Sequence, residues 1–123
     1  MRRDDHLLED IRIAAEDIAE FIAGIKLPDF LSDSTTQAAV ERQLITIGEA
    51  ANRISSEFKQ QHPEIPWKRL TQIRNFYVHG YERLLPESVW GTAKRFIPRV
   101  GKLVSALIPS EDESEGDSPA PNA

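Results

Sequence analysis

The 123-residue chain contains no cysteine, which excludes disulfide bonds and thiolate metal sites. It also lacks any uninterrupted apolar run near the roughly 18 residues that span a bilayer. No apolar signal-peptide core follows the charged residues at the start of the sequence. We therefore expect a soluble, cytoplasmic protein that does not enter a membrane.

The chain has little net charge outside its C-terminal tail. It carries 15 Lys and Arg against 20 Asp and Glu, and five of the acids are Glu111, Asp112, Glu113, Glu115 and Asp117. Residues 1–109 are therefore electrically balanced. The sequence pI of about 5.2 argues against generic tight binding of nucleic acid, which needs a large basic surface. An acidic pI does not exclude a small catalytic pocket with a few local cations.

No segment alternates with the period of two that is typical of strands, and apolar residues instead recur at steps of three and four. This spacing predicts helices over about residues 4–25, 34–58 and 66–79, with a fourth that begins at Pro86. The first two apolar stripes are Leu7, Ile11, Ala14, Ile18, Phe21 and Ile25, and Val40, Leu44, Ile47, Ala51, Ile54 and Phe58. We predict an all-α antiparallel bundle of four to five helices over residues 1–108.

Several residues are expected to begin, end or interrupt these helices. Ser34 and Gln37 fit a capping box at the start of the second helix. Gly48 lies inside that helix, where it should cost about 1 kcal/mol relative to alanine, so we expect a close neighbouring helix as compensation. Gly80 is suited to end the third helix, and Pro98 should kink or break the fourth. Residues 109–123 are acidic, have no large apolar side chain and are expected to be disordered.

The residues with catalytic potential gather at the end of the third helix, in the stretch 74–81. Arg74 has a planar guanidinium that matches phosphate oxygens. His79 has an imidazole, which can accept or donate a proton near pH 7. Asn75 lies one turn before His79, where it could orient the ring, and Tyr81 follows the helix-ending glycine.

This set suits cleavage of RNA by its own 2′-OH. That reaction needs a proton acceptor, a proton donor for the leaving oxygen, and positive charge beside the phosphate. One histidine leaves one of the two proton transfers unassigned. A homodimer that brings two copies of the helix end together would supply a second imidazole.

The spacing Arg-x4-His-x-Tyr resembles the active-site motif of HEPN ribonucleases, in particular the HepT-type toxins. The stretch 41–50, with its leading Arg42 and the run Ile47-Gly48-Glu49-Ala50, is also similar to that family, as are Trp67, Val89-Trp90 and Pro98. The resemblance covers residues 1–108. It implies a metal-independent endoribonuclease toxin that acts on RNA as a homodimer and needs no cofactor.

In that family a small MNT-type nucleotidyltransferase, encoded beside the toxin, silences it by transferring AMP to the tyrosine of the motif. The resemblance therefore implies that Tyr81 is the AMP acceptor and that the transferase is the antitoxin partner. Adenylate placed beside His79 would add bulk and negative charge where the RNA phosphate must lie.

Other interpretations of the same residues stay open. Arg42 could contact RNA or an interface, and Glu49 could reach the site across the dimer, although both could equally belong to a solvated helix surface. The main alternative function is a non-enzymatic helical subunit that regulates the nucleotidyltransferase or binds its nucleotide. A third possibility is a purely structural dimeric bundle.

Overall fold

A computed structural model describes residues 2–79 and 85–109. Its elements are α1 (Arg2–Phe21), α2 (Leu27–Leu31), α3 (Ser34–Arg53), α4 (Ser56–Gln61), α5 (Trp67–His79), α6 (Pro86–Gly91), the π-helix η1 (Thr92–Phe96) and α7 (Ile97–Ser105). There is no strand in these two ranges, so the predicted all-α fold is confirmed. None of the described helices combines enough length and apolar character to cross a membrane. The disorder expected for the acidic tail concerns residues that lie almost entirely outside the described ranges.

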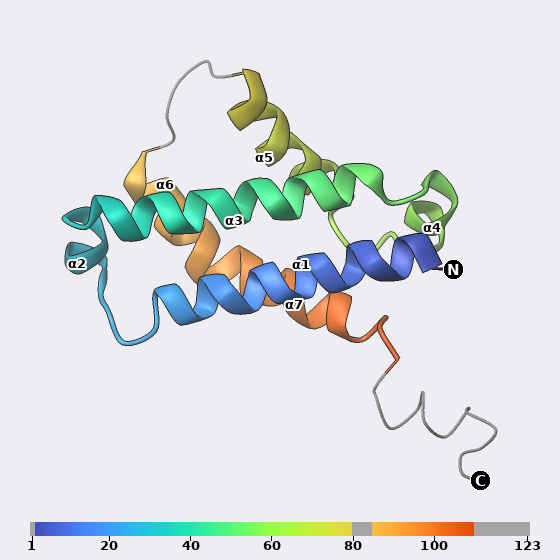
Figure 1. Cartoon of the computed structure of the whole chain (residues 1–123), viewed down its shortest axis with the longest axis horizontal. Coiled ribbons are helices and arrows are strands. Elements are labelled where there is room, and N and C mark those ends of the chain that lie inside the picture. Colours follow the sequence, from blue (N-terminus) through green and yellow to red (C-terminus); the bar gives the residue numbers. More distant parts are fainter. Residues whose placement is uncertain (1, 80–84, 110–123) are drawn as a thin grey trace, which may run out of the picture.

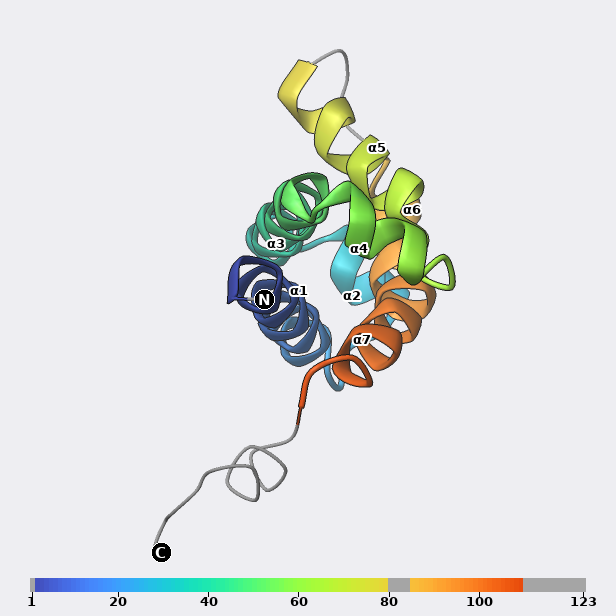
Figure 2. The same ribbon diagram turned by 90° about the vertical axis from the view of Figure 1, so that its right-hand side faces the viewer.

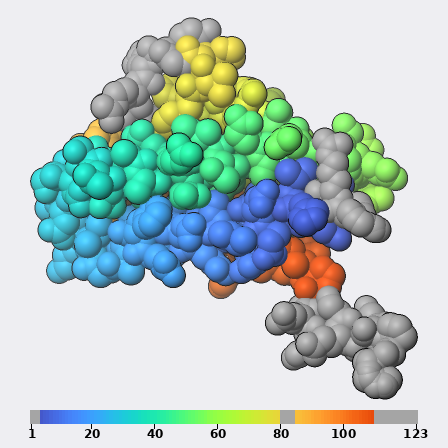
Figure 3. Space-filling view, viewed as in Figure 1, coloured from blue at the N-terminus to red at the C-terminus, as the bar shows by residue number. Residues whose placement is uncertain are grey.

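The long helices α1 and α3 run antiparallel and side by side, and together they form one broad face of the molecule (Figures 1 and 3). Helix α5 packs across α3, and α7 packs along α1 (Figure 2). The predicted stripes supply the centre of the core, where their largest fully buried members are Ile11, Ile18, Val40, Leu44 and Ile47. Removing this apolar surface from water is the main force that holds the helices together.

Helix α1 ends at Phe21, about four residues earlier than the apolar spacing predicts. Ile22 still packs into the core, but Phe21 is 37% exposed. Gly24 adopts a φ of 78°, which an L side chain rarely tolerates and which turns the chain toward the short helix α2. The predicted stripe was thus wrong for Phe21, whereas Ile25 lies beyond the helix but still packs against the core.

The predicted second helix is broken in two, which corrects the single helix expected to reach residue 58. Helix α3 ends at Arg53, and Ser55 caps α4 by accepting a hydrogen bond from Phe58 N at 3.1 Å. Asp4, which is only 5% exposed at the start of α1, accepts bonds from Ser55 N at 3.0 Å and Ser55 Oγ at 2.7 Å. These two bonds join residues that are 51 positions apart in the sequence, and they stabilise the break between α3 and α4.

The N-cap of α3 is Asp33, not the predicted Ser34. Its carboxylate accepts bonds from the Thr36 hydroxyl at 2.6 Å and from Thr36 N at 3.0 Å. These bonds, the hydroxyl bond foremost, lower the pKa of Asp33. Gln37 turns away from the cap, and its Nε2 donates to Phe30 O at 2.8 Å, tying the end of α2 to α3.

The C-terminal helices form one almost continuous rod from Pro86 to Ser105. Pro86 lies in the first turn of α6, as expected. The irregularity expected at Pro98 appears as the π turn η1, in which Ile97 N donates to Thr92 O. Pro98 then lies in the first turn of α7, where its missing N–H matters least.

Candidate active site

The second half of α5 carries the predicted catalytic residues and extends beyond the bundle (Figures 1 and 2). Trp67 and Leu70, near the start of α5, are buried against the core. Toward the other end, Val78 is 52% exposed and His79 is also exposed. The described part of α5 runs to His79. Gly80 and Tyr81 lie outside the described residues.

Arg74 is placed by a close contact between two helices. Gly48 of α3 faces α5 at such short range that a Cβ atom on it would lie 2.5 Å from Arg74 Cβ and 2.9 Å from both Arg74 N and Leu70 O. Real Cβ atoms do not come this near to other carbons. The compensation expected for Gly48 is therefore confirmed, and the residue that it accommodates is the predicted phosphate-binding arginine.

Two polar groups hold the Arg74 guanidinium. Glu49, the residue after Gly48, places Oε2 at 3.5 Å from Arg74 Nε. Asn75 Oδ1 accepts a hydrogen bond from Arg74 Nη1 at 3.0 Å. The Arg74 side chain is 29% exposed and that of Glu49 is 45% exposed, so the pair lies at the surface but is partly shielded. The guanidinium keeps access to solvent while its orientation is restricted.

His79 lies in the last turn of α5, on an exposed surface. It follows Arg74 by five positions, which corresponds to about 140° around an α-helix and about 7.5 Å along it. The two side chains therefore leave α5 in different directions. The sequence placed Asn75 beside His79, and the structure shows that its carboxamide oxygen contacts Arg74.

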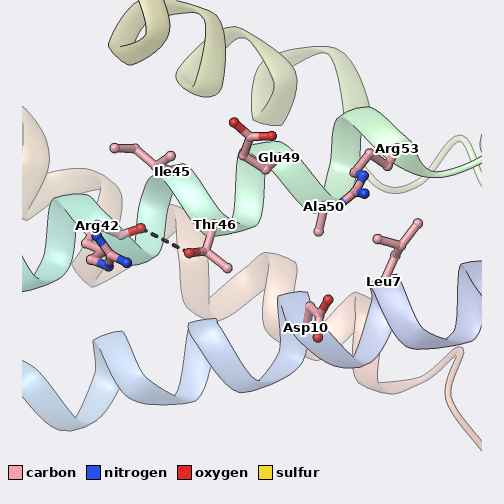
Figure 4. A pocket seen from close by; sticks show the side chains of 8 residues that line it. All are labelled: Leu7, Asp10, Arg42, Ile45, Thr46, Glu49, Ala50 and Arg53. Carbon is pink, nitrogen blue, oxygen red and sulfur yellow. Dashed lines mark hydrogen bonds between the residues drawn. The ribbon is translucent and has the colours of Figure 1, made fainter.

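The other two predicted contact residues, Arg42 and Glu49, line a groove on the face of α3 next to α1 (Figure 4). The groove has a volume of about 430 Å³, and its walls are Leu7, Asp10, Arg42, Ile45, Thr46, Glu49, Ala50 and Arg53. Arg42 and Arg53 stand near its two ends, and Glu49 points toward α5 (Figure 4). Glu49 thus belongs to both the groove and the surroundings of Arg74. Sequence reasoning did not anticipate this groove, because it depends on how α1 and α3 pack.

Across residues 2–79 and 85–109, no group of three or more His, Asp or Glu side chains is arranged to hold a metal ion. The polar groups at the end of α5 are a guanidinium, a carboxamide and an imidazole. Such a set can bind an anion and transfer protons.

Comparison with known proteins identifies the family. The model of the family described as "Ribonuclease HepT-like" matches residues 11–107. The chain is 45% identical over 91 residues to a probable ribonuclease HepT of Thermococcus cleftensis, covering 74% of this chain and 83% of that protein. It is 33% identical over 100 residues to a putative RNase of Methanocaldococcus jannaschii, covering 81% of this chain and 92% of that protein. No solved structure shows significant similarity. The chain belongs to the HepT-like ribonuclease family.

Proposed function

We propose that the protein is a metal-independent endoribonuclease toxin whose site combines Arg74 and His79 in a homodimer. The observation that carries this proposal is the placement of Arg74. The close approach at Gly48 places its Cβ and backbone, Glu49 and Asn75 contact its guanidinium, and it stands five residues before an exposed histidine. An arginine fixed in this way can bind the scissile phosphate without first losing side-chain freedom.

The chemistry is attack of the RNA 2′-OH on the adjacent phosphorus. One His79 imidazole takes the 2′-OH proton, and the His79 imidazole of a second protomer gives a proton to the departing 5′-oxygen. Arg74 stabilises the negative charge on the non-bridging oxygens. The products are a 2′,3′-cyclic phosphate and a free 5′-hydroxyl, so no water enters the first step.

The composition of the exposed end of α5 supports the proposal that the protein forms a homodimer. Val78 is 52% exposed beside His79, and Phe76 and Tyr77, both half-buried, meet edge to face with ring centroids 5.7 Å apart. An apolar and aromatic surface next to a polar site is suited to contact between protomers. Association of two such ends would place two imidazoles in one cleft.

The proposal includes silencing by a nucleotidyltransferase antitoxin that adenylylates Tyr81. This tyrosine follows His79 by two positions in the sequence, so an added AMP would be tethered close to the site. Its phosphate would repel the RNA backbone. We expect co-expression with the transferase to add AMP to the peptide that contains Tyr81, and we expect Tyr81→Phe to abolish that mass shift.

The central test is cleavage of total RNA and tRNA in excess EDTA by wild type, His79→Ala and the control His6→Ala. His6 is an exposed histidine on α1, so the control makes the same substitution far from the site. We expect wild type and His6→Ala to produce 2′,3′-cyclic phosphate ends and His79→Ala to produce none. The mass of each sample is checked first, because adenylylated protein would not cleave RNA. Absence of cleavage by unmodified, dimeric wild type would contradict the proposal and favour a regulatory subunit.

A further inference from the structure

Helices η1 and α7 carry positive charge without any acid. Residues 88–109 contain Lys94, Arg95, Arg99 and Lys102 but no Asp or Glu. All four cationic residues are exposed. The opposite side of the same rod faces the core with Ala93, Phe96, Ile97, Val100 and Val104, all buried. The positive charge is therefore confined to the solvent face of the rod.

A fifth exposed cation, Arg69 of α5, lies beside this face, over the ring of the buried Phe96. The guanidinium carbon of Arg69 lies 3.8 Å from the centroid of the Phe96 ring, and Lys94 Nζ lies 5.4 Å from the centroid of Trp90. Such cation–π contacts hold a charged side chain along the surface without neutralising it. We call Arg69, Lys94, Arg95, Arg99 and Lys102 the basic strip.

None of the five residues of the basic strip forms an ion pair within the part of the chain that the structure describes. Two arginines elsewhere do form ion pairs: Arg12 bonds to Glu9 and Glu16, and Arg74 contacts Glu49. On the facing helix α1, Glu16 lines a groove together with Lys102 but is already held by Arg12. The strip therefore keeps a positive potential although the chain as a whole is acidic.

The arrangement of the strip indicates the class of ligand. Arg95, Arg99 and Lys102 follow one another at steps of four and three, so they rise in line over about 10 Å of helix. A linear row of cations on a convex helix matches an extended polyanion better than a small compact anion. The strip offers no buried pocket for a base, and bases are read by pockets and stacking platforms.

We propose that the basic strip binds the phosphate backbone of single-stranded RNA, at a part of the strand away from the bond that is cut. The choice of RNA rests on the proposed function. Arg69 and Arg74 both lie on α5, about 7.5 Å apart along its axis and about 140° apart around it, so a strand bound at the strip would pass around α5 to reach the site. The strip raises affinity without regard to sequence, and the residues at the end of α5 perform the cleavage.

The test measures binding of a fluorescein-labelled, unstructured 20-nucleotide RNA by anisotropy, with the full chain carrying His79→Ala so that no strand is cut. Salt is varied from about 50 to 200 mM, because each phosphate contact contributes about 0.7 to the slope of log K against log salt for single strands. The variant Arg99→Gln/Lys102→Gln is compared with Lys26→Gln/Lys59→Gln. Both remove two positive charges, but Lys26 is the N-cap residue of α2 and Lys59 lies on α4, so neither belongs to the helices that carry the strip.

We expect the strip variant to lower the slope by about 1.4 and to weaken binding about 25-fold at 0.1 M salt, whereas the control pair stays near the parent protein. Equal changes in the two double variants would overturn the proposal, since net charge alone would then explain binding. Circular dichroism and thermal unfolding confirm that each variant folds. A strip effect in a protein whose wild type never cuts RNA would refute the proposed function alone. Cleavage by wild type without a strip effect would refute the strip alone.

Discussion

The contact between Gly48 and Arg74 leads to a sharp prediction for Gly48→Ala. Two effects of the substitution oppose each other. Alanine is the better helix former, by about 1 kcal/mol, so α3 alone would gain stability. The added methyl group, however, would lie 2.5 Å from Arg74 Cβ and 2.9 Å from the backbone atoms Arg74 N and Leu70 O.

The size of the effect follows from these distances. Carbon atoms in contact normally stand about 3.5–4.0 Å apart, so α5 must move away from α3 by about 1 Å. Backbone atoms cannot rotate out of the way, and such overpacking costs about 1–3 kcal/mol. After the gain in helix propensity, we expect a net destabilisation of about 0–2 kcal/mol, or a fall in Tm of at most roughly 8 °C. A displacement of about 1 Å at a catalytic group reduces the rate on the order of 100-fold.

The assay compares RNA cleavage in EDTA with thermal unfolding for wild type, Gly48→Ala and Gly91→Ala. Gly91 is the matched control, because a Cβ there meets only Arg95 Nη1 at 3.5 Å, which is ordinary contact. We expect Gly48→Ala to lose activity far beyond its loss of stability, and Gly91→Ala to keep activity with an equal or higher Tm. Full activity together with a raised Tm in Gly48→Ala would refute the argument that this close contact positions Arg74.

Three further predictions concern polar contacts. Glu49→Gln should leave Tm almost unchanged, since half-exposed ion pairs contribute at most about 1 kcal/mol, yet it should slow cleavage by releasing Arg74; a rate equal to wild type would contradict this role. Asp4→Ala should lower stability by about 1–3 kcal/mol because Ser55 loses both bonds, seen as a lower denaturant midpoint with cleavage unaffected below the transition. For Asp33, whose pKa is lowered, the stabilisation is complete above its unfolded pKa and is lost as pH falls through the folded value. The Tm difference between wild type and Asp33→Ala should therefore shrink below about pH 4, and a constant difference would exclude the linkage.

The sequence was a good guide wherever a local pattern determines the structure. The apolar spacing identified the buried residues of α1 and α3, because helical periodicity places them on one face. The penalty of a mid-helix glycine correctly implied a close neighbour at Gly48. The arginine motif at the end of α5 agrees with the family that the comparisons identify, although the roles of its residues remain predictions.

The features that sequence reasoning missed depend on contacts between distant segments. The apolar stripe continues from Ile54 to Phe58, but the helix breaks because Asp4 from another helix binds Ser55. Asp33 and Ser34 are both good N-cap residues, and only the backbone angles decide between them. The basic strip includes Arg69 only because its side chain, from α5, reaches the Phe96 ring of η1. Helical periodicity cannot reveal a contact between two separate helices.

Within the described residues, burial decreases along α5 from its first turn to His79. Leu70 is buried and Arg74 lies against α3, whereas Val78 and His79 are exposed. A helix end with few buried contacts opens locally at small free-energy cost, so the amide hydrogens of the last turn should exchange with solvent much faster than those near Leu70. Melting and re-forming of that single turn would move the histidine while the arginine keeps its place. If Arg74 and His79 act together as proposed, their relative placement would thereby be lost and regained without global unfolding.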